Sequence, residues 1–244
     1  MTLSHSTRTR PASWRGCART GCGTRERQSW CAAAADDKGN IVTIAERYEE
    51  TIPVPRAIRF PVELIPPEGF DPERIETWPK VEGRLEYVNG RLLYMPPCGD
   101  MQQDTVADVV GVLLQWARAH AGFVVSTNEA GMLLHGGARG ADAAIWRRSE
   151  LGQYRHKFRR VPPVLAVEVA GEDEDEPVLR DKAAWYLGAG VQVVWLVLPE
   201  QREVVVLTGT GERRCRCAET LPPHPTLPDL TPHVDDFFVQ ISAG

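Results

Sequence analysis

The clearest pattern of apolar and polar positions lies in the second half of the chain, where it predicts a strand, a helix and another strand. Residues 164–170 are apolar apart from Glu168, as in a strand buried on both faces. A helix is predicted over 176–190, because its apolar side chains recur with a period of 3.6 residues. Residues 191–198 are again apolar and predict the second strand, and the acidic run 172–176 connects the first strand to the helix.

Two charged residues interrupt these apolar patterns. Glu168 lies in the middle of the first strand, and Lys182 lies on the helical stripe that should pack against the sheet. An ionised carboxylate that enters an apolar interior loses several kcal/mol of hydration unless a cation or hydrogen bonds compensate. The simplest account of both residues is that their charges meet at one site.

Residues 84–95 predict a β-hairpin. Asn89 and Gly90 suit a type I′ turn, and strand-forming residues flank them on both sides. Glu86 lies in the first strand of this hairpin, where an exposed position is the ordinary interpretation of a glutamate.

The remaining elements follow from shorter patterns. They are a helix over 101–120 with Asp104 as its N-cap, two short strands in 123–134, a strand over 141–146, a hairpin of 203–208 with 191–198, an edge strand over 213–219 and a short helix at 234–238. Together they predict one α/β domain over residues 45–240, with a central mixed sheet flanked by helices.

Composition adds few constraints to this picture. The chain has 244 residues, 43% hydrophobic and 25% charged, and no run of 18 apolar residues that would cross a membrane. Its net charge of −5 does not favour nucleic acid overall, so a contact with DNA needs a local basic patch. The best candidate is 147–160, where six Lys and Arg residues outnumber the single acid, Glu150.

Residues 1–44 differ from the rest of the chain. The first 40 carry seven Lys and Arg against three acids and almost no aliphatic residues, so a disordered basic extension is predicted. A transit-like segment, an extension without function and a tail that binds phosphate are all compatible with it. The six cysteines contain no CxxC pair, and we expect reduced thiols in a cytoplasmic protein.

Asp142, Glu168 and Lys182 form a candidate catalytic group. Asp142 opens one predicted strand, and Glu168 lies in the next long strand, 26 positions later. Carboxylates on neighbouring strands can hold Mg²⁺ or Mn²⁺, and a lysine beside them can stabilise charge on a phosphoryl oxygen. Carboxylates and lysines are common, so a buried Glu168–Lys182 ion pair without catalysis is an equally open interpretation of the spacing.

Four segments then resemble a known family. They read LEYVNGRLLYMPP, RGADAAIWRR, PPVLAVEVAG and LRDKAAWYLGAGVQVVWLVLPEQREVVVL, and run in this order from about residue 84 to 208. The chain resembles the Uma2 family of endonucleases, which have the restriction-endonuclease-like PD-(D/E)xK fold. The resemblance implies Mg²⁺-dependent hydrolysis of DNA on an α/β core.

The resemblance also assigns roles to residues. Asp142 and Glu168 are implied as metal ligands and Glu86 as an additional acid in the metal shell. Lys182 is implied as the catalytic lysine, moved from strand to helix, because Ala170 occupies the lysine position of the E-x-K pattern. Two further departures are Ala141, where the family has proline, and Gln102–Gln103, where it often has histidine.

The expected function is therefore a metal-dependent endonuclease that acts on DNA and not at a membrane. The alternative is a nuclease-fold module without catalysis that binds nucleic acid or a protein. A third interpretation is a homodimer subunit that associates through the edge at 203–217. Binding of Mn²⁺ that depends on Asp142 separates the first interpretation from the other two.

Overall fold

A computed structural model of the chain describes residues 33–35, 41–43, 60–153, 157–172 and 174–242. The chain divides into two compact units, Met1–Val54 and Pro55–Gly244. In the first unit the structure describes an antiparallel pair of strands, β1 (Ala33–Ala35) and β2 (Ile41–Thr43). The predicted disorder of residues 1–44 otherwise lies outside the described residues.

The second unit holds the α/β domain. Its described elements are β3 (Val62–Leu64), the 3₁₀ helix η1 (Ile75–Thr77), β4 (Arg84–Val88), β5 (Arg91–Met95), α1 (Asp100–Ala119), β6 (Phe123–Leu134), β7 (Gly137–Arg147), η2 (Arg148–Glu150), β8 (Leu165–Val169), α2 (Glu176–Gly188), β9 (Val193–Leu198), β10 (Glu203–Thr208), β11 (Gly211–Arg216), η3 (Val234–Phe237) and α3 (Val239–Ser242). Nine of its strands form one sheet.

The sheet is mixed, as the sequence predicts. Its order is β11-β10-β9-β8-β7-β4-β5-β3, and β6 pairs with β7 beside this path. Only β8 and β9 run parallel among the described pairs, joined by α2 as a crossover helix. The predicted hairpins are present as β4–β5, with positive φ at Asn89 and Gly90, and as β9–β10.

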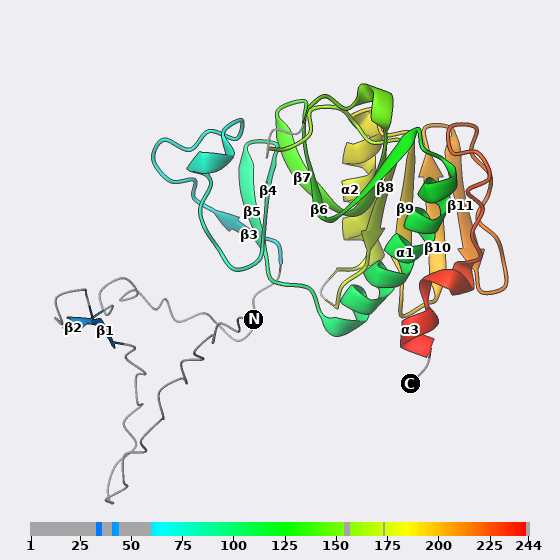
Figure 1. Cartoon of the computed structure of the whole chain (residues 1–244), viewed down its shortest axis with the longest axis horizontal. Helices are drawn as coiled ribbons and strands as arrows, with labels where there is room; N and C mark the ends of the chain where they lie inside the picture. The colour runs from blue at the N-terminus through cyan, green and yellow to red at the C-terminus, as the bar shows by residue number, and fades with distance from the viewer. Residues whose placement is uncertain (1–32, 36–40, 44–59, 154–156, 173, 243–244) are drawn as a thin grey trace, which may run out of the picture. The chain divides into compact units, whose positions relative to one another are not determined.

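Helices cover both faces of the sheet (Figure 1). On one face α1 and the C-terminal segment around η3 pack on the sheet through large apolar side chains, among them Leu113, Trp116 and Phe237. On the other face α2 packs through Leu179, Ala183 and Tyr186. Burial of these side chains, at about 1.5–3 kcal/mol for each large one, fixes the position of α2 and therefore of Lys182.

Strand β7 is the strand on which the site is built. β6 pairs along its whole length, from Gly137 to Arg147, and so takes one edge. The other edge is shared: β8 pairs with residues 143–145 and β4 pairs at Ala138. Residues 139–142 lie between these two partners, where the sheet divides and polar side chains can enter it.

Two boundaries differ from the predicted ones. Residues 123–134 form one strand, β6, instead of two, because the predicted bend is a β-bulge between Thr127 and Ala130. Helix α1 begins at Asp100 after Gly99, so the predicted N-cap Asp104 is wrong and lies within the helix.

Several cations of the basic segment 147–160 have partners at the surface of the molecule. Arg147 pairs with Glu150 at 3.4 Å, and Arg160 pairs with Glu73. Arg148 donates to two backbone carbonyls of the preceding loop. Two acids, Glu150 and Glu73, pair with two of the five described Lys and Arg residues, so the segment keeps a positive excess and the phosphate-facing surface stays a prediction.

At the end of the sheet, β11 pairs with β10, and its other edge has no strand partner within the described residues. This matches the predicted edge strand, although β11 begins and ends earlier than 213–219. None of the helices in the described part of the chain has the length and hydropathy that crossing a membrane requires.

Gly83, directly before β4, is a position where only glycine fits. Its φ is +127°, and a Cβ there would lie 2.4 Å from the Met95 carbonyl oxygen. We expect Gly83→Ala to lower the free energy of unfolding by more than about 1 kcal/mol, because both backbone strain and a clash result. Gly111→Ala is the opposite control: it lies in α1 with open space around it and should raise stability by roughly 0.5–1 kcal/mol. Urea unfolding measures both, and a Gly83→Ala protein as stable as wild type would contradict the argument.

Candidate functional site

Asp142 and Glu168 face each other across two neighbouring strands. In the antiparallel register of β7 with β8, Ala143 lies opposite Val167, and one further step places Asp142 opposite Glu168. Directly opposite residues of an antiparallel pair point to the same face, here the face that α2 covers. Both side chains are buried, with exposed fractions of 7% and 0%.

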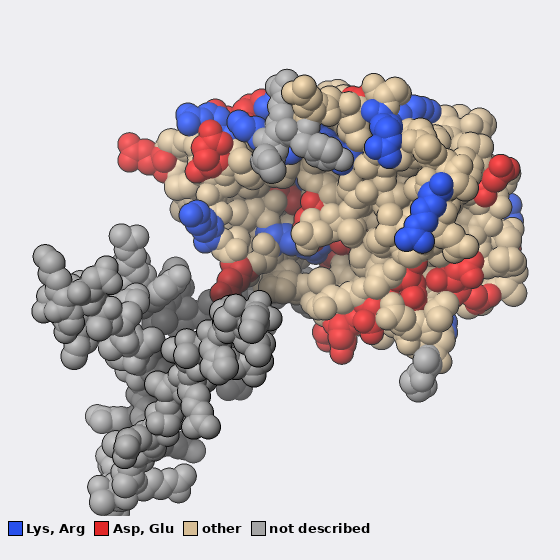
Figure 2. All heavy atoms as spheres, in the orientation of Figure 1, with Lys and Arg blue, Asp and Glu red and all other residues tan. Residues whose placement is uncertain are grey.

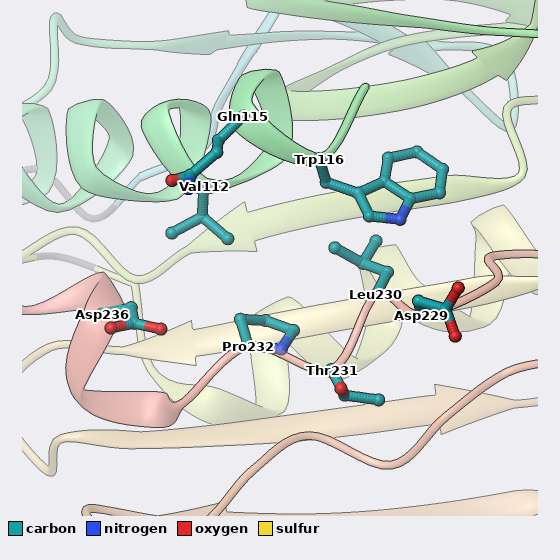
Figure 3. A pocket seen from close by; sticks show the side chains of 8 residues that line it. All are labelled: Val112, Gln115, Trp116, Asp229, Leu230, Thr231, Pro232 and Asp236. Carbon is teal, nitrogen blue, oxygen red and sulfur yellow. The ribbon is translucent and has the colours of Figure 1, made fainter. Parts of the chain in front are cut away.

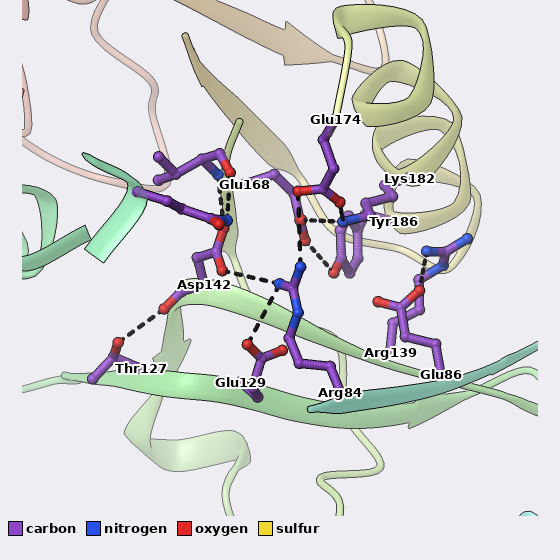
Figure 4. A network of polar contacts seen from close by, with 12 residues as sticks. Arg84, Glu86, Thr127, Glu129, Arg139, Asp142, Glu168, Glu174, Lys182 and Tyr186 are labelled. Atoms are coloured by element: carbon purple, nitrogen blue, oxygen red, sulfur yellow. Dashed lines mark hydrogen bonds and ion pairs between the residues drawn. The ribbon is translucent and has the colours of Figure 1, made fainter. Parts of the chain in front are cut away.

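Helix α2 supplies both partners of Glu168. Lys182 Nζ donates to one carboxylate oxygen at 3.1 Å, and the Tyr186 hydroxyl donates to the other at 2.6 Å (Figure 4). Lys182 and Tyr186 are four residues apart, so they lie on one side of the helix. The apolar stripe that packs α2 on the sheet therefore also delivers the two donors to Glu168.

Asp142 is held by a weaker set of contacts. Its Oδ2 accepts a hydrogen bond from the Val169 backbone N–H at 2.8 Å, and its Oδ1 lies 3.5 Å from Arg84 Nη1. Burial and the neighbouring charge of Glu168 raise the pKa of Asp142 to about 8, against the smaller opposite effects of Lys182 and Arg84. At neutral pH Asp142 thus keeps its proton unless a further positive charge enters the site.

Lys182 remains charged although it is buried. Burial alone would lower its pKa, but the carboxylates of Glu168, Glu86 and Glu174 outweigh burial and raise it. Glu174, which precedes α2, accepts from Lys182 Nζ at 2.6 Å, and its pKa falls because the attraction of Lys182 and Arg84 exceeds the cost of burial. An amine in this setting can stabilise negative charge but cannot accept a proton.

Arg84 reaches into the centre of the carboxylates from β4. Its guanidinium nitrogens lie 3.4 Å from Glu129, 3.5 Å from Asp142 and 3.8 Å from Glu174. The surrounding carboxylates raise its pKa further above the ordinary arginine value despite burial. Arg84 is therefore the second permanent cation of the site, beside Lys182.

Glu129 enters the site through the bulge in β6. Asn128 and Glu129 both have a left-handed backbone, with φ of 58° and 57°, which is uncommon for two consecutive residues other than glycine. Burial of the carboxyl group raises the pKa of Glu129 to about 7, although Arg84 opposes this. Backbone strain concentrated beside a group of carboxylates is typical of a functional site.

Glu86 contacts a different cation. Its carboxylate accepts from Arg139 Nη1 at 2.5 Å, and the guanidinium of Arg139 lies 5.5 Å from the ring centre of Trp185. Burial raises the pKa of Glu86, although Lys182 and Arg139 lower it. The structure thus places Glu86 beside the group formed by Glu168 and Lys182, in a buried ion pair of its own.

Gln102, from the first turn of α1, closes the site on the side of Val169. Its Nε2 donates to the Val169 carbonyl at 2.8 Å, and both groups are buried. Gly171 makes room for this side chain, because a Cβ there would lie 2.9 Å from Gln102 Oε1.

The charges of this group suit a divalent cation. Its five carboxylates and three cations sum to −2 when all are ionised: Glu86, Glu129, Asp142, Glu168 and Glu174 against Arg84, Arg139 and Lys182. Asp142 and Glu168 offer carboxylate oxygens from neighbouring strands, and Mg²⁺ and Mn²⁺ prefer oxygen ligands. Among the described residues no three His, Cys, Asp or Glu side chains form a ready metal cluster. A Mg²⁺ site with one or two protein carboxylates and several waters needs none, so the residues fit the ion.

Of the predicted site residues, Glu168 and Lys182 are in direct contact, Asp142 lies opposite Glu168, and Glu86 lies nearby with Arg139. Arg84, Glu129, Glu174, Tyr186, Arg139 and Gln102 complete the group and are absent from the sequence prediction. The sequence pattern around each of them is ordinary, so the pattern alone gives no signal for them.

The hollows on the described part of the domain include the following two. One of about 580 Å³ adjoins the site through Gln102 and Glu174 and is otherwise lined by the ends of α1, α2 and β9. The other, of about 520 Å³, lies between α1 and the C-terminal segment around Leu230 (Figure 3). Neither lining contains a Lys or Arg: two carboxylates line the second hollow and six line the first, so a phosphate near the first hollow would depend on the cations of the adjoining site. The space-filling view shows acidic and basic side chains together inside a recess between the β4–β5 hairpin and α1 (Figure 2).

Comparisons with known proteins agree with this fold. No curated protein matches the chain. A solved structure from Anabaena variabilis ATCC 29413, described as "a putative nuclease belonging to DUF820", matches with a TM-score of 0.61 at 16% identity and covers 70% of this chain and 98% of that one. The model of the Uma2 family, described as "Putative restriction endonuclease", matches residues 72–235, which is more than half of the chain. The chain therefore belongs to the Uma2 family.

Proposed function

We propose that this protein is a metal-dependent nuclease that hydrolyses phosphodiester bonds in DNA. The observation that carries the proposal is the buried pair Asp142–Glu168 with Lys182 bound to the same glutamate at 3.1 Å. The description of the Uma2 family and that of the Anabaena protein support a nuclease, and DNA is the substrate that a restriction endonuclease implies.

Asp142 and Glu168 would hold Mg²⁺ or Mn²⁺. The bound ion would supply a Lewis acid for the phosphodiester and lower the pKa of an attacking water. The protein's part is to place two carboxylate groups on one face of a rigid sheet, with Tyr186 and the Val169 N–H fixing their orientation. Such outer hydrogen bonds keep ligating carboxylates in a single geometry.

Lys182 would stabilise negative charge that grows on the phosphoryl oxygens. Because the carboxylates around it raise its pKa, its ammonium group is present at every physiological pH. It therefore acts by its charge, as a fixed donor in a site that excludes much of the water. The acid–base steps must be carried out by other groups or by water.

In this proposal Glu86 has a structural role that supports the site. Its contact with Arg139 anchors β4 to β7 at the point where the sheet divides. The proposed contribution of Glu86 to the metal shell would require its carboxylate to leave or share this ion pair.

Cleavage of plasmid DNA tests the proposed function. We expect the purified full-length protein to convert supercoiled plasmid to nicked or linear forms with Mn²⁺ or Mg²⁺, and to leave it intact with EDTA. A calorimetric titration with Mn²⁺ alone is run in parallel. A folded protein that neither binds Mn²⁺ nor cuts single- or double-stranded DNA would overturn the proposal. Binding of DNA without cleavage under the same conditions would favour the nuclease-fold binding module instead.

A further inference from the structure

Arg84 makes the weakest contacts of the three cations in the site. Lys182 lies 2.6 and 3.1 Å from its carboxylates and Arg139 lies 2.5 Å from Glu86. The three contacts of Arg84 are 3.4, 3.5 and 3.8 Å long, and the longest exceeds hydrogen-bonding range. Arg84 is therefore shared among three acids without a close bond to any of them.

The Arg84 side chain also has an unused donor. Its Nε is buried and has no hydrogen-bond acceptor, while only 12% of the side chain is exposed. A buried donor without an acceptor is unfavourable, so part of the guanidinium is left unsatisfied at this position. An anion with several oxygens that approached the site would supply the missing acceptor.

The position of Arg84 conflicts with that of a metal ion. The guanidinium lies beside Asp142 Oδ1, the carboxylate oxygen that has no backbone donor. A divalent cation bound to Asp142 would therefore repel Arg84 over a few ångströms in a site of low dielectric. Both positive charges would draw on the same carboxylate, and of the two the arginine is the one on a flexible side chain that can move away.

We propose that Arg84 is a substrate-binding residue that rests on the carboxylates of the site, competes there with the divalent cation, and binds a phosphate of the substrate when the cation displaces it. This inference rests on the proposed nuclease function and specifies an additional residue for it. A guanidinium matches phosphate oxygens in a planar, two-pronged geometry, which would also use the idle Nε.

The proposal predicts two effects of opposite direction from one substitution. Arg84→Gln removes the competing charge, so Mn²⁺ should bind at least about threefold more tightly than in wild type. The same change removes a phosphate contact, so cleavage at saturating Mn²⁺ should fall by about 100-fold. Arg84→Lys keeps the charge but loses the planar fork, so its Mn²⁺ affinity should stay near that of wild type while cleavage falls partially.

The experiment measures calorimetric binding of Mn²⁺ alone and cleavage of supercoiled plasmid by the full-length protein. Arg91→Gln is the matched control, because Arg91 lies in the same hairpin in an exposed ion pair with Glu63. It should change neither quantity. General damage to the fold would weaken binding and cleavage together, which circular dichroism and the control would reveal.

The outcomes separate this inference from the proposed function. If wild type binds Mn²⁺ and cuts DNA but Arg84→Gln binds the ion equally or less tightly, or cuts as fast as wild type, the inference on Arg84 is overturned and the nuclease function stands. If neither wild type nor Arg84→Gln binds Mn²⁺, both are overturned. If Arg84→Gln binds Mn²⁺ and wild type does not, Arg84 excludes the ion from the wild-type site, which supports the proposed competition.

Discussion

Asp142→Asn is expected to abolish Mn²⁺ binding and to lower DNA cleavage by more than about 100-fold, since it removes a proposed ligand and not merely its support. The asparagine oxygen can still accept the hydrogen bond from the Val169 N–H, so the local backbone should be preserved. Calorimetry with Mn²⁺ and plasmid cleavage measure the two effects. Asp181→Asn, an exposed aspartate on α2, is the matched control and should leave both unchanged.

The same variant should be more stable than wild type at high pH in the absence of metal. The folded-state pKa of Asp142 is about 8, against 3.8 for an ordinary aspartate. The folded protein then binds a proton that the unfolded chain releases, and stability from this group falls as pH rises between these two values. Asparagine imitates the protonated form at every pH. As the pH rises from 3.8 to about 8, the unfolding free energy of wild type should therefore fall relative to that of Asp142→Asn by at most about 1.4 kcal/mol per pH unit.

Urea unfolding at pH 5, 7 and 9, with EDTA present, measures this shift. Asp181→Asn again serves as the comparison, because its side chain is exposed. If Asp142→Asn were less stable than wild type by the same margin at all three values, Asp142 would be ionised in the folded protein. The raised pKa of Asp142, and with it the expectation that the metal-free site keeps a proton on this residue, would then be wrong.

The central residues of the site could be predicted because they violate apolar patterns. Glu168 and Lys182 interrupt a buried strand and a buried helical stripe, and their contact follows from the crossover that joins β8, α2 and β9. Asp142 is less conspicuous, because it only opens a predicted strand, and the resemblance to Uma2 adds to the candidate role that its strand position indicates. The structure shows it opposite Glu168 because of the register between β7 and β8.

The other charged residues of the site could not be predicted because their local patterns are ordinary. Arg84 occupies an edge position of a hairpin strand, and Glu174 belongs to an acidic run that suits a helix N-terminus. In the structure Asp175 does cap α2, whereas Glu174 turns inward to Lys182. Only the packing of α2 against the sheet, at the place where β7 changes partner from β8 to β4, distinguishes Glu174 from Asp175.

The wrong N-cap of α1 and the wrong division of β6 into two strands also arise from contacts that are distant in sequence. The predicted helix 101–120 agrees with α1 to within one residue at each end, but Asp104 is not its N-cap, because the hydrogen bond from Gln102 to Val169 holds the turn before Asp104 against the sheet. Strand β6 is paired with β7 both before and after its bulge, so the local turn signal in the sequence does not end the strand. Contacts distant in sequence decide both cases.

Lys182→Met is expected to destabilise the protein and to inactivate it. The substitution leaves Glu168 and Glu174 buried without their shared cation, and removal of one partner of a buried ion pair costs roughly 3–5 kcal/mol. Methionine has a similar shape, so a packing defect should contribute little. Cleavage at saturating Mn²⁺ should fall by about 100- to 1,000-fold, because the fixed donor for the phosphoryl oxygens is lost.

A double variant separates the two effects of Lys182. Lys182→Met with Glu174→Gln removes one of the uncompensated carboxylates, so part of the lost stability should return in urea unfolding. Activity should not return with it, since the proposed role of Lys182 is to carry charge to the substrate. Recovery of cleavage along with stability would show that Lys182 acts only by holding the fold together. That result would favour the interpretation of Glu168–Lys182 as a structural ion pair, and the proposed mechanism would lose its lysine.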